Sequence, residues 1–166
     1  VTIASWGGSY QEAQSKALFQ PASAATGIEV KEETYGGMSD VRLQVSTGNV
    51  TLDIVASGSG SAARAAAEGL LEKLDYSVID VSTFYPTLYT DYCVGGDVFS
   101  TVYAWNTETY GENAPQSWAD FWDVEKFPGT RAYRGKVAGA LEPAILADGM
   151  GPGDGYKVID HAAGHE

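Results

Sequence analysis

The sequence is poor in the residue types that form disulfides, bind transition metals or act as general bases. Among its 166 residues there is one cysteine, Cys93, and there are two histidines, His161 and His165, near the C-terminus. A single cysteine cannot form an intrachain disulfide, and it excludes a zinc site built from several cysteines. Both histidines lie in a glycine-containing terminal segment, which is more typical of a frayed end than of a metal site or a catalytic triad. We therefore expect no enzyme activity, no cofactor and no bound metal.

Basic residues and long apolar runs are also scarce. Ten Lys and Arg residues stand against 22 Asp and Glu residues, which gives a formal net charge of −12. Such a negative field repels a phosphate backbone and an anionic membrane surface, which argues against a nucleic-acid partner. No apolar run approaches the roughly 20 residues that a membrane-spanning helix requires. The chain opens directly on an apolar segment at Val1, as expected either of a secreted protein whose leader has been removed or of a chain that was trimmed at this end.

What the sequence does have is a regular alternation of β-prone and helix-prone segments up to residue 74. Apolar residues make up 44% of the chain, enough for one ordinary domain or two small lobes. The pattern predicts a parallel sheet with helices on its faces, with strands at residues 1–6, 28–35 and 52–56 and helices at residues 10–20, 40–47 and 61–74. The first of these helices is expected to stop before Pro21, and the last is expected to continue through Gly69.

Three loops follow the carboxyl ends of these predicted strands, at residues 6–10, 35–39 and 57–61. In open parallel sheets ligands bind beyond those ends, so we predict that the three loops lie side by side and form the binding site. Trp6 and Tyr10 flank a glycine turn in the first loop, where aromatic faces and the N–H groups of a helix start can meet a ligand. Burial of both rings in the core is the alternative.

The regular alternation of strand and helix patterns ends after residue 75. A β-prone run at residues 98–105 is predicted to be a strand and to carry a crossing between two lobes. Ser117 is predicted to cap a helix at residues 118–123, and a further helix is predicted at residues 141–148. Few residues follow, so the second lobe is expected to be incomplete. We assign residues 1–102 to the first lobe, and residues 103–166 to the crossover and a partial second lobe.

A dinucleotide-binding enzyme is the alternative function. Gly58-Ser59-Gly60 follows an apolar strand and precedes a helix, and Asp80 lies at about the spacing of the acidic residue that binds a ribose. However, that fingerprint normally follows the first strand of its domain, and its acidic residue normally ends the next strand. Asp80 instead follows a helix and a tyrosine-containing loop. The pattern therefore favours this alternative only weakly.

Several segments together resemble the periplasmic solute-binding proteins of ABC importers, of the spermidine/putrescine-binding type. The resemblance covers about residues 1–160, and the segments that carry it best are 4–10, 27–30, 52–58, 100–107, 115–123, 127–129 and 141–149. It implies an α/β fold of the type II periplasmic-binding-protein class, with a mostly parallel sheet, helices on both faces, and two lobes that close on a ligand by hinge motion. Such proteins are considerably longer, so the resemblance also implies a fragment, which self-associates if its apolar surface stays uncovered.

The resemblance further implies a function and a set of binding residues. The protein would bind a small cationic, polyamine-like solute in the periplasm and deliver it to an ABC permease in the inner membrane. Aromatic faces would hold the methylene chain and ammonium groups, and a carboxylate would pair with the charge. The family's first turn is more polar and contains an acid, where this chain has Gly7-Gly8-Ser9. The implied ligand-binding residues are Trp6, Ser9, Tyr10, Ser57, Ser59, Trp105, Asn106 and Glu142.

Overall fold

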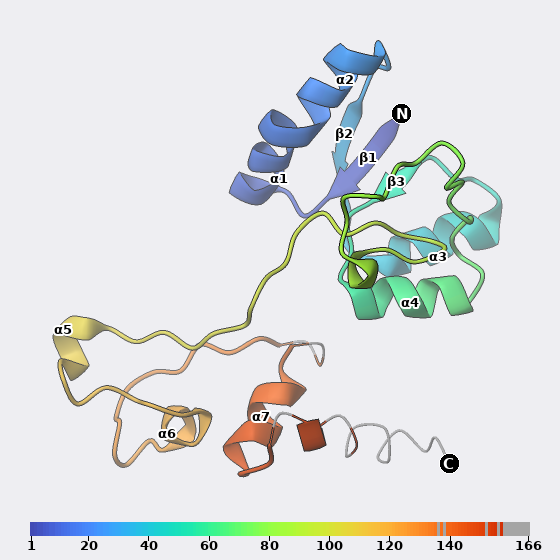
Figure 1. The fold of residues 1–166 in the computed structure, drawn as a ribbon. Helices are drawn as coiled ribbons and strands as arrows, with labels where there is room; N and C mark the ends of the chain where they lie inside the picture. The colour runs from blue at the N-terminus through green and yellow to red at the C-terminus, as the bar shows by residue number, and fades with distance from the viewer. Residues whose placement is uncertain (136, 138, 152, 156, 158–166) are drawn as a thin grey trace. The chain divides into compact units, whose positions relative to one another are not determined.

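A computed structural model describes residues 1–135, 137, 139–151, 153–155 and 157 of the chain (Figure 1). The chain divides into two compact units, Val1–Val98 and Phe99–Glu166, which we call the first and the second unit. None of the helices in the described part of the chain is long and apolar enough to cross a membrane.

The first unit is built on a parallel sheet of three strands in the order β2-β1-β3. The strands are β1 (Thr2–Ser5), β2 (Lys31–Thr34) and β3 (Ile54–Val55). In the register of the sheet, Ser5 lies opposite Thr34 on one side of β1, and Ala4 lies opposite Val55 on the other. Ala4 and Ser5 are fully buried, because β1 is the central strand. The three predicted strands are confirmed, although each is shorter than the β-prone run that predicted it.

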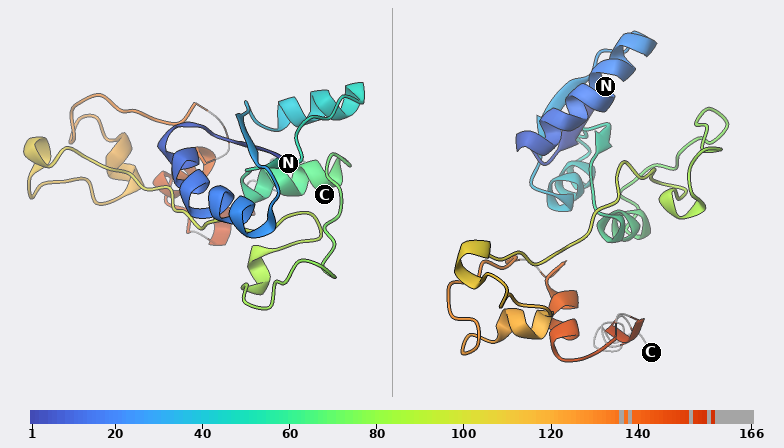
Figure 2. Two further views of the ribbon diagram at one scale, coloured as in Figure 1. Left: turned by 90° about the horizontal axis from the view of Figure 1, so that it is seen from above. Right: turned by 60° about the vertical axis from the view of Figure 1, so that its left-hand side comes forward.

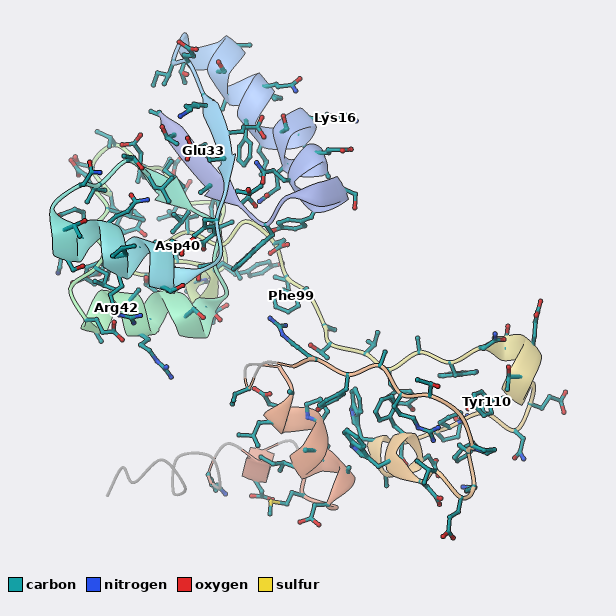
Figure 3. The ribbon with its side chains drawn as sticks, turned by 180° about the vertical axis from the view of Figure 1, so that it is seen from behind. Lys16, Glu33, Asp40, Arg42, Phe99 and Tyr110 are labelled. Carbon is teal, nitrogen blue, oxygen red and sulfur yellow. The ribbon has the colours of Figure 1, made fainter. Side chains whose placement is uncertain are left out.

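Helices cover both faces of this sheet, as the sequence predicts. One continuous helix made of α1 (Gly8–Gln14), η1 (Ser15–Phe19) and α2 (Gln20–Thr26) connects β1 to β2. α3 (Met38–Thr47) connects β2 to β3, and α4 (Ser59–Ala67) follows β3. The crossover from β1 to β2 and the crossover from β2 to β3 run across the sheet in opposite directions, and since such crossovers are right-handed, their helices lie on opposite faces (Figures 1 and 2). Arg42 on α3 and Glu68 just after α4 form an ion pair at 2.5 Å (Figure 3).

The first helix does not stop before Pro21, and that prediction is wrong. Proline lacks an N–H group, and its ring crowds the preceding helical turn. Here the turn before it is a π turn over Ser15–Phe19, in which the N–H of Gln20 reaches back five residues to the carbonyl of Ser15. This wider turn accommodates the proline ring, and the helix runs on to Thr26.

The prediction that the last helix of the first unit continues through Gly69 is also wrong. α4 ends at Ala67, and Gly69 adopts a left-handed conformation with φ of 72°. The N–H of Gly69 bonds to the carbonyl of Ala66 at 3.0 Å, and the N–H of Leu70 bonds to that of Ala65 at 2.9 Å. Gly69 is therefore the residue that ends the helix and closes its last turn, which is the commonest use of glycine at helix ends.

The β-prone run at residues 98–105 does not form the predicted strand. The segment is without regular structure, and its side chains Val98, Phe99 and Val102 are largely exposed; Phe99, for example, is 72% exposed (Figure 3). A strand needs a partner for its backbone N–H and C=O groups, and no described strand lies alongside this segment. A high β-propensity alone is therefore not sufficient to form a strand at residues 98–105.

In its described residues, the second unit contains short helices joined by loops. They include α5 (Thr107–Tyr110), α6 (Trp118–Trp122) and α7 (Leu141–Ala147). The short 3₁₀ turn η2 (Pro86–Leu88) belongs to the first unit. The predicted cap of α6 is confirmed, since Ser117 Oγ accepts from the N–H of Asp120 at 3.0 Å. At the other end of α6, the guanidinium of Arg131 donates to carbonyls of Phe121 at 2.8 Å and of Asp123 at 3.2 Å.

The glycine at the start of the first helix gives a direct test of this fold. Gly7 has φ of 75°, and a Cβ placed on it would lie 3.2 Å from Cγ2 of Thr34. We expect Gly7→Ala to lower the free energy of unfolding by about 1–2 kcal/mol, measured by urea titration. Gly60→Ala is the matched control, because Gly60 lies within α4 and a Cβ there meets nothing within 4 Å. Equal losses in both variants would contradict the assigned backbone strain.

Candidate functional site

The three predicted loops lie side by side at the carboxyl edge of the sheet, which confirms the predicted placement of the loops. The register pairs Ser5 with Thr34, so Trp6, the first residue after β1, lies next to Tyr35, the first residue after β2. The register also pairs Ala4 with Val55, so Trp6 lies next to Ser57, the second residue after β3. The rings of Trp6 and Tyr35 are 5.2 Å apart between centroids. The hydroxyl of Tyr35 donates to the carbonyl of Ala56 in the third loop. One aromatic side chain therefore touches both neighbouring loops.

Trp6 presents an aromatic surface at this edge. Its side chain is 50% exposed, although the ring packs on Tyr35 at an interplanar angle of 31°. The alternative of a fully buried core tryptophan is therefore excluded for this position. An exposed indole face can hold the methylene groups or the ammonium group of a solute.

Three helices begin at the same edge, and their first turns are uncapped. The residues that precede α1, α3 and α4 are Gly7, Gly37 and Gly58, and none of these positions has a side-chain cap hydrogen bond. The first N–H groups of a helix have no partner within the helix, and the helix dipole places partial positive charge on them. Ser9 and Ser59 lie in the first turns of α1 and α4 and are exposed. Together, these donors can meet an anionic group such as a carboxylate.

The hydroxyl of Tyr10 is engaged within the first unit. It donates to Oδ2 of Asp97 at 3.0 Å and accepts from Nε2 of Gln14 at 3.4 Å. Burial raises the pKa of Tyr10, and the hydrogen bond to Asp97 and the charge of that carboxylate raise it further. Tyr10 therefore offers its partly exposed ring to a ligand, while its hydroxyl holds the segment just before the unit boundary.

In the second unit, Trp105 and Asn106 stand at the start of α5. Trp105 is 39% exposed and packs on Tyr103 with centroids 5.9 Å apart. The side-chain oxygen of Asn106 accepts from the N–H groups of Glu108 at 2.8 Å and Thr109 at 3.2 Å, so it caps α5. The amide nitrogen of Asn106 is the part of that side chain that could donate to a solute.

Glu142 lies in the first turn of α7, beside a series of packed aromatic rings. Its Oε2 is buried, and within the described part of the chain no donor reaches it. Burial raises the pKa of Tyr133, and the charge of Glu142 raises it further, so the two side chains are neighbours. From Tyr133 the ring contacts run on to the candidate Trp105 through Phe121, Trp118 and Tyr103. Trp105 and Glu142 therefore belong to one packed surface of the second unit.

An open groove of about 410 Å³ in the first unit borders the first loop at Gly7 and Gly8. It runs between α1, η1 and β2, and Ser15 and Glu32 hydrogen-bond across it at 2.6 Å. Neither Trp6, Tyr35 nor Ser57 lines it. The exposed indole and the uncapped helix starts lie at the strand-end loops, so these loops are the candidate site.

The described residues give little support for a metal site or a dinucleotide-binding site. Among the described residues there is no group of three His, Cys, Asp or Glu side chains that could hold a metal. His161 and His165 lie outside the described residues. The Gly58-Ser59-Gly60 turn follows the two-residue strand β3 and not the first strand. The carboxylate of Asp80 accepts from the N–H of Ser82 at 2.8 Å within a turn and does not end a strand. The context that a dinucleotide site requires is not present there.

Sequence reasoning did not single out Tyr35, Asp97 and the aromatic residues around Tyr133. For Tyr35 a signal was available, because Tyr35-Gly36-Gly37 repeats the pattern of Trp6-Gly7-Gly8 at the end of the adjacent strand. For Asp97 there was none, since its contact with Tyr10 joins residues 87 positions apart in an irregular segment.

Comparison with known proteins agrees with this geometry. Residues 17–163 match the model of a family described as bacterial extracellular solute-binding protein. The chain is 39% identical to the gamma-aminobutyric acid-binding protein of Pseudomonas aeruginosa, over 96% of the chain and 46% of that protein. Its sequence is 43% identical to that of PBP MotA from A. tumefaciens B6, whose crystal structure is in complex with glucopine. The two structures superpose with a TM-score of 0.90, over 96% of the chain and 50% of MotA. The predicted periplasmic-binding-protein fold class is therefore confirmed.

The spermidine/putrescine type is a more distant relative than these two. PotD from Streptococcus pneumoniae, a spermidine/putrescine transporter substrate-binding protein, is 25% identical, with a TM-score of 0.61, over 92% of the chain and 48% of PotD. The chain thus spans about half the length of the proteins that it matches. The matched family is one of solute-binding proteins and not of enzymes, as the sequence predicts. Because its model covers residues 17–163, the chain belongs to the bacterial extracellular solute-binding protein family.

Proposed function

We propose that this protein is the periplasmic solute-binding component of an ABC importer and delivers a small organic solute to a permease in the inner membrane. The observation that carries the proposal is the exposed Trp6 at the meeting point of three strand-end loops, in a chain of this family. In this proposal, residues 1–102 act as the first lobe and residues 103–166 as the crossover and part of the second.

We further propose that the solute is amino-acid-like, with both a carboxylate and an amino group. The uncapped starts of α1, α3 and α4 supply N–H donors suited to a carboxylate. A polyamine has no anionic group and would leave those donors to water. The printed names of the relatives point the same way, since one binds gamma-aminobutyric acid and another is in complex with glucopine. The cationic, polyamine-like solute that the sequence resemblance implies is the competing candidate.

The roles of the candidate residues follow from their surroundings. In the first unit, Trp6 and the ring of Tyr10 contact the apolar or cationic part of the solute. The hydroxyls at the loops add donors, from Ser9, Ser57 and Ser59. The second unit offers an aromatic face at Trp105, an amide at Asn106 and a counter-charge for an ammonium group at Glu142.

Substitution at Trp6 and Glu142 tests these roles. We expect Trp6→Ala and Glu142→Gln each to weaken binding of gamma-aminobutyric acid by about 1–2 kcal/mol in calorimetric titrations, the first through loss of an aromatic face and the second through loss of a counter-charge. Trp6→Phe keeps an aromatic ring and should lose less. Glu125→Gln is the matched control for charge, because Glu125 is an exposed glutamate of the same unit.

Titrations of the unchanged protein with putrescine and spermidine separate the two solute classes. Tighter binding of a polyamine than of gamma-aminobutyric acid would overturn the amino-acid-like solute and restore the polyamine prediction. Unchanged affinity in both Trp6→Ala and Glu142→Gln would overturn the assigned binding residues.

The contact between Tyr10 and Asp97 predicts a pH dependence. A raised pKa in the folded state means that the folded protein holds the phenolic proton more tightly than the unfolded chain does. The stability from this group is therefore fully present below about pH 10 and is lost as the pH rises through the folded-state pKa. We expect Asp97→Asn to lower the pKa of Tyr10, followed by NMR of labelled tyrosine rings. Asp148→Asn, in the second unit, should leave that pKa unchanged.

A further inference from the structure

We propose that Tyr35 is a positioning residue that sets solute specificity by fixing the orientation of the Trp6 ring. This inference rests on the proposed function, in which Trp6 contacts the solute. Tyr35 itself lies one strand away from Trp6 and acts through it. Neither the sequence pattern nor the relatives assign it this role.

The strand register brings the two aromatic residues together. Ser5 pairs with Thr34, so Trp6 and Tyr35 are the next residues out of two adjacent parallel strands. The N–H of Tyr35 donates to the carbonyl of Ser5 at 3.2 Å, which extends the ladder up to this position. The two rings then meet at 5.2 Å with an interplanar angle of 31°. Their contact is a consequence of the sheet and does not depend on loop packing.

Tyr35 is also tied to the third loop. Its hydroxyl donates to the carbonyl of Ala56, and that residue's N–H bonds to the carbonyl of Ala4 at 2.9 Å. Burial of Tyr35 raises its pKa, so the phenol is a neutral donor at physiological pH. The ring is therefore held at its backbone end by β1 and at its hydroxyl end by the residue that follows β3. A ring fixed at both ends is a firm support for the indole beside it.

Three glycines of these loops lie beside open space, although the N–H of Gly7 donates to Oε1 of Gln11 at 2.9 Å and the N–H of Gly36 donates to Oδ2 of Asp40 at 2.7 Å. A Cβ placed on Gly8, Gly37 or Gly58 would meet nothing within 4 Å, so no side chain or backbone packs closely against these positions. A half-exposed tryptophan on such a loop would sample several rotamers if its neighbour were removed. Because a bound solute would then have to order the indole, binding would weaken, and solutes that depend on the aromatic face would weaken most.

A double-mutant cycle tests whether Tyr35 acts through Trp6. Using gamma-aminobutyric acid as the probe, we expect Tyr35→Leu to raise the Kd about 3- to 10-fold, and Tyr35→Phe, which keeps the ring but loses the bond to Ala56, about 2-fold. In a Trp6→Leu background, Tyr35→Leu should have less than about a 2-fold effect. Equal effects in both backgrounds would overturn the inference, because Tyr35 would then be acting independently of Trp6.

A second readout follows the indole directly. In protein labelled with 5-fluorotryptophan, the ¹⁹F resonance of Trp6, assigned by Trp6→Phe, should shift or broaden in Tyr35→Leu while the other tryptophan resonances stay in place. Tyr76→Leu is the matched control, because Tyr76 also packs on a tyrosine, Tyr89, at 5.7 Å and donates its hydroxyl to a backbone carbonyl, that of Thr90. It should change neither the Kd nor the Trp6 resonance.

The two readouts separate failure of this inference from failure of the proposed function. If the unchanged protein does not bind gamma-aminobutyric acid, the proposed solute class fails, and the putrescine and spermidine titrations then supply the probe for the cycle. An unperturbed Trp6 resonance in Tyr35→Leu would overturn the inference whether or not the solute class is correct.

Discussion

The pairing of β1 with a parallel strand on each side is the constraint on which the first unit depends. It buries Ala4 and Ser5 completely, and it fixes where the chain leaves each strand. Parallel strands in register release their loops at one edge, so residues far apart in sequence become neighbours there. Trp6 and Tyr35 come together for this reason, and a candidate site arises without any contribution from loop packing.

The helix starts at this edge explain how a negatively charged protein could bind a solute that carries a carboxylate. A chain with a net charge of −12 repels anions at long range, yet the proposed solute carries a carboxylate. Screening limits that repulsion to about 8 Å at physiological salt, whereas uncapped N–H groups act at contact distance. Glycine precedes α1, α3 and α4, so no side chain at these positions caps the helix starts, although the N–H of Asp40 bonds to the carbonyl of Gly37 at 3.0 Å. In the proposed function, the N–H groups at the helix starts, and not the net charge, select the solute group that suits this edge.

The second unit is held together in a different way. Ring-to-ring contacts link Trp105 to Tyr133, and the guanidinium of Arg131 binds four backbone carbonyls around the end of α6. A planar guanidinium with five donors can satisfy several orphan carbonyls at once, which short helices without a sheet require. Among the described residues, Oε2 of Glu142, beside Tyr133, is a buried side-chain oxygen without a hydrogen-bond partner, which is why that carboxylate remains a candidate for contact with a ligand.

The sequence by itself determined the alternation of strands and helices, the parallel sheet and the three strand-end loops, because apolar periodicity and glycine turns are local signals. The resemblance of several segments also indicated the solute-binding protein family, although the spermidine/putrescine type is only a distant relative. The sequence also located the Ser117 cap. Only the tertiary structure decided that Pro21 stays within a helix, that Gly69 ends one, and that residues 98–105 form no strand. It alone brought Tyr35 against Trp6. The physical reason is that strand pairing and contacts between distant residues depend on partners whose positions no local pattern encodes.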